Sequence, residues 1–408
     1  MSIILTQLSS FNIPLLLGMF LFYFVGGYLM YGSLFAAIGA SVESETDTQQ
    51  FIMPITIPLL FAFFSLQMIL ENPDSSLAFW ASIFPLTSPI VMMGRLPFDP
   101  PMWEIALSMV LLIIGFIFVS SLVLKPINWT TPSHEIPVSV YQPNLTLEEK
   151  WSYEGIEQTQ KMFESSVKEA LESELIVFPE TALIQSRDEI EEWLQSINEA
   201  SKSKDISLLT GIIAKSEDDR ANNLMRNRIM GLGSASGSYD KQQLVPFGEF
   251  IPLERFLGKL LDLMGLKLTN TVPGDQFSHI KSTILKISPS ICYEIAYPGL
   301  INKSAGNSNI LVTISNDTWF GSSIGPEQHL QLAKDRVLEH QKPLLRSTNS
   351  GISAIIDHKG NVLNRQGYFE EKTLKGKVVL QEGYTPYNHL GNLIIYLYIG
   401  IIIFLNIL

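Results

Sequence analysis

Three residues of the chain have side chains that together could carry out acyl transfer: Glu180, Lys241 and Cys292. A thiol attacks a carbonyl as its thiolate, so it needs a base or a nearby cation. A carboxylate can take the thiol proton if burial raises its pKa, and a lysine can stabilise an oxyanion. These three groups would need neither a metal ion nor a histidine.

Each of these residues also has an ordinary structural explanation. Cys292 is the only cysteine among 408 residues, and a lone cysteine is more often a small buried hydrophobe than a nucleophile. Glu180 could cap a helix, Lys241 could lie on the surface, Glu249 could be solvated, and Glu294 could be a salt-bridge partner. Spacing alone does not bring them into one pocket, so these alternatives stay open at this point.

The three candidate residues come close to the ends of expected strands. "ELIVFPETAL" predicts a strand over residues 175–178, and the strand-like "STILKISPSICYE" ends near the cysteine. Helices are expected over residues 147–174, 189–203 and 327–341. Strands that alternate with helices and are almost continuously apolar indicate an α/β fold with a sheet covered by helices. Such folds place their functional groups just past strand ends.

Charge is distributed unevenly along the chain. Residues 1–124 contain seven acidic residues and one basic residue, Arg95, and residues 383–408 contain no charge. The net charge of −12 argues against a nucleic-acid partner, because phosphate binding needs a basic surface. A single cysteine excludes a disulfide within the chain, and no Walker-type phosphate loop is present.

Long apolar segments predict membrane spans, because about 20 apolar residues in a helix cross a bilayer. Spans are expected over residues 13–40, 52–70, 105–124 and 390–408. The shorter segment 80–93 contains two prolines and is expected to be interfacial or re-entrant. Buried core helices of a soluble protein are the alternative. The predicted domains are a transmembrane region over 1–124, a soluble domain over 134–383 and a C-terminal transmembrane helix over 390–408.

Six motifs appear in a fixed order along the rest of the chain: "FPETA", "YDKQQLVPFGEFIPLE", "ICYE", "SNDTWFG", "RSTNSGISAIID" and "GYTPYNHLGN". Together they closely resemble the apolipoprotein N-acyltransferases of the nitrilase superfamily, from about residue 138 to the C-terminus. "VPFGE" and "CYE" distinguish this family from soluble nitrilases. The resemblance implies an αββα sandwich attached to an α-helical transmembrane region.

The resemblance also implies a Glu-Lys-Cys triad. It makes Cys292 the nucleophile, Glu180 the general base and Lys241 the oxyanion stabiliser.

Five further residues match the family's pattern. Glu249 is implied as a carboxylate that supports the lysine. Tyr293 and Glu294 match the residues after the nucleophile, and the Tyr293 N–H would be a second oxyanion donor. Trp151 resembles a tryptophan near the lipid entrance, and Asn227 resembles a polar family position.

The implied reaction needs no cofactor and no metal. The cysteine would take an acyl chain from a phospholipid, typically phosphatidylethanolamine, and pass it to the S-diacylglyceryl cysteine of an apolipoprotein. The implied location is the bacterial inner membrane, with several spans and a periplasmic catalytic domain.

Residues 1–124 resemble a different family. "YLMYGSLFAAIGASVESETDTQQFIMPITIPLL" and "FPLTSPIVMMGRLP" are similar to the C-terminal membrane part of ABC-2 type transporter permeases. Such a permease would end in the cytoplasm, which conflicts with a periplasmic catalytic domain. Two alternative functions therefore remain: a permease subunit fused to an inactive domain, and a membrane-tethered carbon-nitrogen hydrolase.

Overall fold

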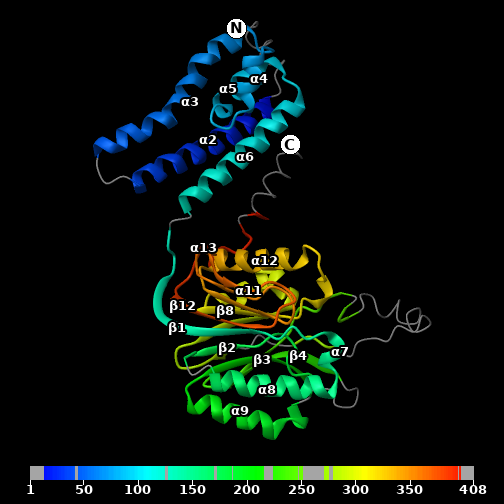
Figure 1. Cartoon of the computed structure of the whole chain (residues 1–408). Helices are drawn as coiled ribbons and strands as arrows, with labels where there is room; N and C mark the ends of the chain where they lie inside the picture. The colour runs from blue at the N-terminus through cyan, green and yellow to red at the C-terminus, as the bar shows by residue number, and fades with distance from the viewer. Residues whose placement is uncertain are drawn as a thin grey trace, which may run out of the picture. The chain divides into compact units, whose positions relative to one another are not determined.

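The computed structural model divides the chain into two compact units, Met1–Ile127 with Ile395–Leu408, and Asn128–Ile394. Figure 1 shows the elements of each unit. The structure describes residues 13–41, 45–124, 127–169, 172–185, 187–215, 224–246, 248–250, 271–274, 279–393 and 395–396.

The first unit contains three helices that are long and apolar enough to cross a membrane, α2 (Ile13–Ser41), α3 (Glu45–Glu71) and α6 (Met102–Leu124). They cover three of the segments expected as spans. The apolar side chains of these helices are largely exposed, as lipid-facing side chains are. The fourth expected span, 390–408, lies mostly outside the described residues.

Two short helices, α4 (Ser76–Ile83) and α5 (Ser88–Arg95), lie where the sequence predicted an interfacial or re-entrant segment. A 3-10 turn, η1 (Leu96–Phe98), follows them. Arg95 is buried; its Nη1 donates to Glu104 Oε2 on α6 at 2.8 Å and to Ser82 Oγ on α4 at 2.7 Å. A buried charge needs such partners, so this ion pair fixes the helical hairpin against α6.

The second unit contains two six-stranded mixed sheets. The order in the first sheet is β12-β1-β2-β3-β4-β5, and in the second it is β11-β10-β9-β8-β7-β6. The three strands at the centre of each sheet run parallel, β1-β2-β3 and β7-β8-β9. The first sheet contains β1 (Thr131–Gln142), β2 (Leu175–Val177), β3 (Ser207–Lys215), β4 (Met225–Gly233), β5 (Ser238–Asp240) and β12 (Lys372–Glu382). The second contains β6 (Ile280–Lys281), β7 (Lys286–Ile291), β8 (Ile310–Ser315), β9 (Leu344–Thr348), β10 (Ala354–Ile356) and β11 (Val362–Arg365).

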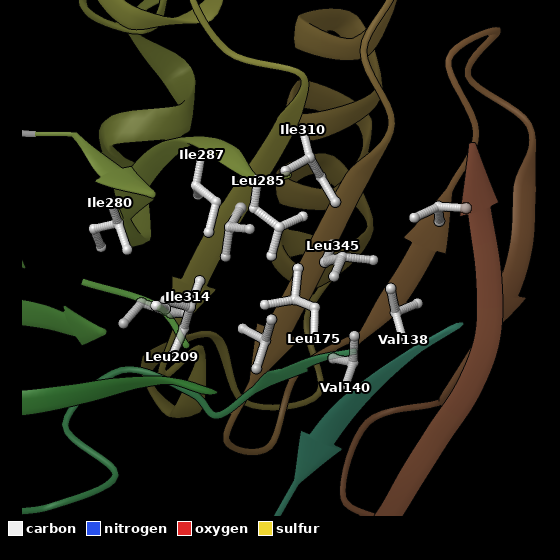
Figure 2. Packing of buried hydrophobic residues seen from close by; sticks show 14 of the residues in the cluster. Val138, Val140, Leu175, Leu209, Ile280, Leu285, Ile287, Ile310, Ile314 and Leu345 are labelled. Atoms are coloured by element: carbon white, nitrogen blue, oxygen red, sulfur yellow. The ribbon is translucent and has the colours of Figure 1, made fainter. Parts of the chain in front are cut away.

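The main core lies between the two sheets. Figure 2 shows Val138, Val140 and Leu175 from the first sheet opposite branched side chains from the second, among them Ile310 and Leu345. Alternate residues of a strand point to the same face, so the two-residue spacing of Val138 and Val140 places both in this core. The sheets therefore bury one apolar face each against the other.

Helices cover the outer face of each sheet (Figure 1). α8 (Tyr153–Glu169) and α9 (Glu191–Ser203) bury Phe163 and Leu194 against the first sheet. α11 (Pro298–Ala305) and α12 (Gly325–His340) bury Ile301 and Leu330 against the second. These four layers confirm the predicted αββα sandwich.

The helix expected over residues 147–174 is interrupted, and that part of the prediction is wrong. α7 (Leu147–Lys150) ends before Trp151, and α8 begins after Ser152. The Ser152 hydroxyl accepts a hydrogen bond from the Gly155 N–H at 3.0 Å, which starts a new helix. Helical periodicity continues across the break, so the pattern alone did not reveal it. Trp151 is left between two helices with 59% of its surface exposed.

Both ends of the sandwich domain are attached to the C-terminal end of α12 and the residue that caps it. The Trp129 N–H donates to Gln341 Oε1 at 2.7 Å, close to the point where the chain enters the domain. Near the exit, α13 (Pro386–Leu390) contributes Asn388, whose Nδ2 lies 2.8 Å from His340 Nδ1. The Thr385 hydroxyl donates to the carbonyl of Glu339. The two chain connections therefore meet at the C-terminal end of one helix.

Candidate active site

A pocket of about 540 Å³ opens in the sandwich domain. It brings together most of the residues predicted from the sequence. Those that line it are Trp151, Glu180, Asn227, Lys241, Glu249, Cys292 and Tyr293. Of the predicted set, only Glu294 is absent from the pocket wall.

Glu180 lies in a tight turn after β2. The turn passes so close to β3 that a Cβ added at Gly211 would lie 2.5 Å from the Thr181 nitrogen and 2.6 Å from the Pro179 oxygen. Thr181 has a φ of 45°, a left-handed conformation that is strained for a β-branched residue. The backbone of this turn therefore sets where the carboxylate points.

The Glu180 carboxylate is held by three groups. Asn227 Nδ2 donates to Oε1 at 2.6 Å, and the Asn316 N–H donates to Oε2 at 2.9 Å. Lys241 Nζ lies 3.7 Å from Oε1. Glu180 does not cap a helix, and its carboxylate is directed into the pocket. Asn227 is thus a direct partner of Glu180.

Lys241 is 1% exposed, so the alternative of a surface lysine is wrong. Its Nζ donates to Glu249 Oε1 at 2.6 Å, and Glu249 Oε2 accepts from the Val245 N–H at 2.9 Å. Burial alone would lower the pKa of Lys241, but the negative charges of Glu180 and Glu249 raise it above its ordinary value. Lys241 therefore stays charged between two carboxylates.

Cys292 begins the 3-10 turn η3 (Cys292–Ala296), directly after β7, with a φ of 55°. Burial, together with the charge of Glu180, raises the pKa of the thiol to about 12; Lys241 and a hydrogen bond with Ser315 act in the opposite direction. At neutral pH the thiol is therefore protonated, and it needs a base to become a nucleophile.

Glu294 lies beneath the pocket and is fully buried. Its Oε1 accepts from the Tyr239 hydroxyl and from the Gln242 and Gln243 N–H groups, and its Oε2 accepts from the Ile291 N–H, at 2.7 to 3.0 Å. These partners are neutral donors, not the cation that a salt bridge would need. Burial raises the pKa of Glu294 above its ordinary value. The side chain joins the loop that follows Lys241 to the turn that begins with Cys292.

A buried charged cluster lies behind the Cys292 turn. His329 Nε2 is 3.1 Å from the Cys292 carbonyl oxygen, and a carbonyl only accepts, so Nε2 carries a proton. His329 Nδ1 lies 3.0 Å from Asp317 Oδ1, and Arg346 Nη2 donates to Asp317 Oδ2 at 2.6 Å. Burial acts to raise the pKa of Asp317, but Arg346 and His329 hold it well below its usual range.

The rim of the pocket is aromatic and exposed. Trp319 is 82% exposed, and Trp151 and Tyr293 are also exposed. Apolar side chains continue inward from this rim, including Ile184 and Ile213. The pocket thus combines a charged floor with walls that suit a hydrocarbon chain.

Residues 138–385 match the family model described as carbon-nitrogen hydrolase, and they make up more than half of the chain. The chain belongs to the carbon-nitrogen hydrolase family. A second family model, ABC-2 family transporter protein, matches residues 1–125. The first 125 residues are therefore similar to a transporter, as their sequence indicated.

Curated relatives of this chain are named apolipoprotein N-acyltransferase. One from Pseudomonas paraeruginosa is 33% identical over 311 residues, which cover 76% of this chain and 60% of the relative. One from Azotobacter vinelandii is 33% identical over 341 residues, which cover 81% and 64%. The chain thus spans less than two-thirds of the length of these relatives.

A carbon-nitrogen hydrolase from Helicobacter pylori is a solved structure similar to this chain. It has a TM-score of 0.47 and 17% identity, and the match covers 60% of this chain and 89% of that one.

No metal-binding cluster of three or more His, Cys, Asp or Glu side chains is found among the residues that the structure describes. The carbon-nitrogen hydrolase pocket is built instead from a carboxylate, an ammonium and a thiol.

Sequence reasoning missed four residues around this carbon-nitrogen hydrolase pocket: Lys150, Asp317, His329 and Arg346. Three of them stood inside or beside noted residues and motifs: Asp317 lies in "SNDTWFG", Arg346 opens "RSTNSGISAIID", and Lys150 precedes Trp151. His329 gave no such signal, because only the fold of α12 brings it to the Cys292 carbonyl.

Proposed function

We propose that this protein is an N-acyltransferase of the bacterial inner membrane. It moves an acyl chain from a phospholipid, through a thioester on Cys292, to the amine of an S-diacylglyceryl cysteine at the N-terminus of an apolipoprotein. The observation that carries the proposal is the pocket itself, in which a buried carboxylate, a buried ammonium and the only thiol of the chain lie beneath an apolar rim.

The first half-reaction loads the enzyme. Glu180 takes the thiol proton of Cys292 while the sulfur attacks the ester carbonyl carbon of the phospholipid. Lys241 and the Tyr293 N–H stabilise the oxyanion that forms on the carbonyl oxygen. The carbon–oxygen bond then breaks, and the lysophospholipid leaves as an alcohol with the proton that Glu180 returns.

The second half-reaction transfers the acyl chain to the acceptor. The amine nitrogen attacks the thioester carbonyl and gives a proton to Glu180. The carbon–sulfur bond breaks, the new amide leaves, and Cys292 takes the proton back as a thiol. The high pKa of the Cys292 thiol makes a base necessary in the first half and a proton donor to the departing sulfur necessary in the second.

Three further residues would maintain this geometry. Glu249 keeps the Lys241 ammonium in place through the 2.6 Å bond, and Asn227 orients Glu180 through another. Glu294 ties the loop after Lys241 to the Cys292 turn. Phosphatidylethanolamine is the proposed acyl donor, and Trp151 at the rim would meet it first.

The deciding experiment is an intact-mass measurement of the detergent-purified full chain after incubation with phosphatidylethanolamine. We expect one added acyl mass that neutral hydroxylamine removes and that Cys292→Ala lacks. Addition of an S-diacylglyceryl peptide should then discharge the acyl group onto the peptide amine. A Cys292→Ala chain that still acylates the peptide would reject the proposal.

The same measurement separates this function from the hydrolase alternative. The family description and the triad also suit hydrolysis of a small amide. Release of ammonia from a soluble amide, with no acyl adduct from phospholipid, would favour a membrane-tethered carbon-nitrogen hydrolase. An inert pocket in both assays would favour the permease alternative.

A further inference from the structure

Lys150 is a buried lysine in the pocket wall that has no part in the steps above. Its side chain reaches from the end of α7 to the turn that carries Glu180, and the residue is 5% exposed. The ammonium donates to the backbone carbonyl of Glu180 and to the hydroxyl of Thr181, both at 3.2 Å. It therefore bonds to the backbone of the base rather than to its carboxylate.

The position of the Glu180 carboxylate depends on the backbone shape of this turn, so a bond that restrains the turn also restrains the carboxylate. Thr181 holds a left-handed φ, and Gly211 leaves no room on the opposite side of the turn. The Glu180 carboxylate meets Asn227 and Asn316 only while the turn keeps this shape. Lys150 bonds to Glu180 and Thr181, the two residues whose backbone conformation decides the shape of this turn.

Burying the Lys150 ammonium in this position costs free energy of hydration. Burial lowers the pKa of Lys150 to about 8, and the charge of Glu180 only partly offsets that effect. None of the ion pairs within 4.0 Å among the described residues includes Lys150. An apolar side chain could occupy the same space without losing hydration, so the charged group points to a specific task.

Lys150 is itself fixed by its surroundings. Thr146 and Glu149 form a reciprocal cap at the start of α7, with bonds of 2.8 and 3.2 Å. The Asn349 side chain bonds both the N–H and the carbonyl of Leu145. The next residue after Lys150 is Trp151, at the exposed rim of the pocket. A short anchored helix thus joins the rim to the turn of the base.

We propose that Lys150 is a positioning residue that holds the Glu180 turn in its productive shape and connects this turn to the pocket rim at Trp151. The inference rests on the proposed function for the role of Glu180. Lys150 contacts neither the thiol nor the acyl chain in this proposal, and it acts only through Glu180.

The first test compares Lys150→Met, Lys150→Arg and the control Lys161→Met in single-turnover acyl loading of the full chain. Lys161 lies on α8 with its side chain 70% exposed. We expect Lys150→Met to slow maximal loading about 10- to 100-fold, as a misplaced catalytic group does. The half-saturating phospholipid concentration should stay unchanged. Lys150→Arg should recover part of the rate, and Lys161→Met should match the parent.

Two results of this test would overturn the inference. One is a folded Lys150→Met chain that loads at the parental rate. The other is a rise in the half-saturating concentration alone, which would make Lys150 a substrate-binding residue. If Lys150→Met fails to fold by thermal melting, Lys150→Gln takes its place, because an amide can still donate to one of the two oxygens.

The second test needs no lipid substrate. Because Cys292 is the only cysteine, its alkylation rate by iodoacetamide reports on the pocket alone. Lys150→Met and Glu180→Gln should change this rate in the same direction, and the double variant should equal Glu180→Gln, because Lys150 acts through Glu180. Fully additive effects would contradict the inference. A parent that is alkylated but never acylated would reject the proposed function and leave this test intact.

Discussion

At the scale of the single residue, the pocket shows how buried charges are kept ionised. Lys241 is flanked by Glu180 and Glu249, and Asp317 is held by Arg346 and His329. Lys241 and Asp317 each have an opposite charge beside them, which offsets part of the lost hydration, whereas Lys150 bonds only to neutral oxygens. The Cys292 thiolate is not stabilised in this way, because the thiol lies near both the negative charge of Glu180 and the positive charge of Lys241.

His340 allows a prediction about stability and pH. Burial, with the charges of Arg336 and Lys342, lowers the pKa of His340 to about 3 in the folded domain. The unfolded chain binds a proton near the ordinary value of 6.5, so stability is full above that pH. It is lost as the pH falls toward the folded value, by up to about 1.4 kcal/mol per pH unit.

We therefore expect the thermal midpoint of the parent to drop between pH 6.5 and pH 5. His340→Gln should show a weaker drop, since it cannot take up the proton. The measurement is thermal melting of both proteins over this range. Burial also lowers the pKa of His329, so we expect protonation of His329 to cause the drop in thermal midpoint that remains in His340→Gln. Equal slopes for the two proteins would contradict the prediction.

The sequence could predict the acidic, basic and thiol groups but not all of their partners. Glu180, Lys241 and Cys292 stood near strand ends and in motifs, and the pocket contains all three. Lys150 and His329 could not be found this way. They reach the site through contacts between residues 30 and 37 positions apart, and such contacts leave no periodic signal along the chain.

At the scale of the element, the alternation of strands and helices was a reliable guide, because each strand is apolar along most of its length. The break between α7 and α8 was missed for a physical reason. A single serine cap and a close approach of Gly155 to the Glu149 carbonyl decide it, and neither changes the hydrophobic pattern. The sheet order was also beyond the sequence, since it depends on which apolar faces meet.

Gly211 gives a prediction about the turn that carries Glu180. Gly211→Ala would push a Cβ into the turn at 2.5 to 2.8 Å, so we expect a loss of about 1–3 kcal/mol in stability. We also expect slower acyl loading than the stability loss explains, because the carboxylate moves. Gly299→Ala on α11 is the matched control, with open space around its Cβ. Thermal melting and loading rates of both variants check this, and similar behaviour of the two would refute it.

At the scale of the whole molecule, two resemblances make opposite statements about location. The carbon-nitrogen hydrolase model covers residues 138–385, and the transporter model covers residues 1–125. A permease of that kind is expected to end in the cytoplasm, whereas the proposed function expects a periplasmic pocket. Orientation is therefore the property that decides whether the pocket meets its acceptor.

Protease accessibility tests the orientation directly. We expect protease added outside sealed spheroplasts to digest the sandwich domain, as a periplasmic domain requires. Cytoplasmic marker proteins should survive in the same sample, which shows that the membrane is sealed. Digestion of the domain only after lysis would place it in the cytoplasm and would leave the pocket without lipoprotein acceptors.

The attachment of both chain connections to α12 has a mechanical consequence. This helix of 16 residues is about 24 Å long. Trp129 and Asn388 bond to its C-terminal end, and His329, near its other end, bonds to the carbonyl of Cys292. Because a helix is stiff along its axis, a displacement of its C-terminal end would move His329 and, with it, the Cys292 carbonyl.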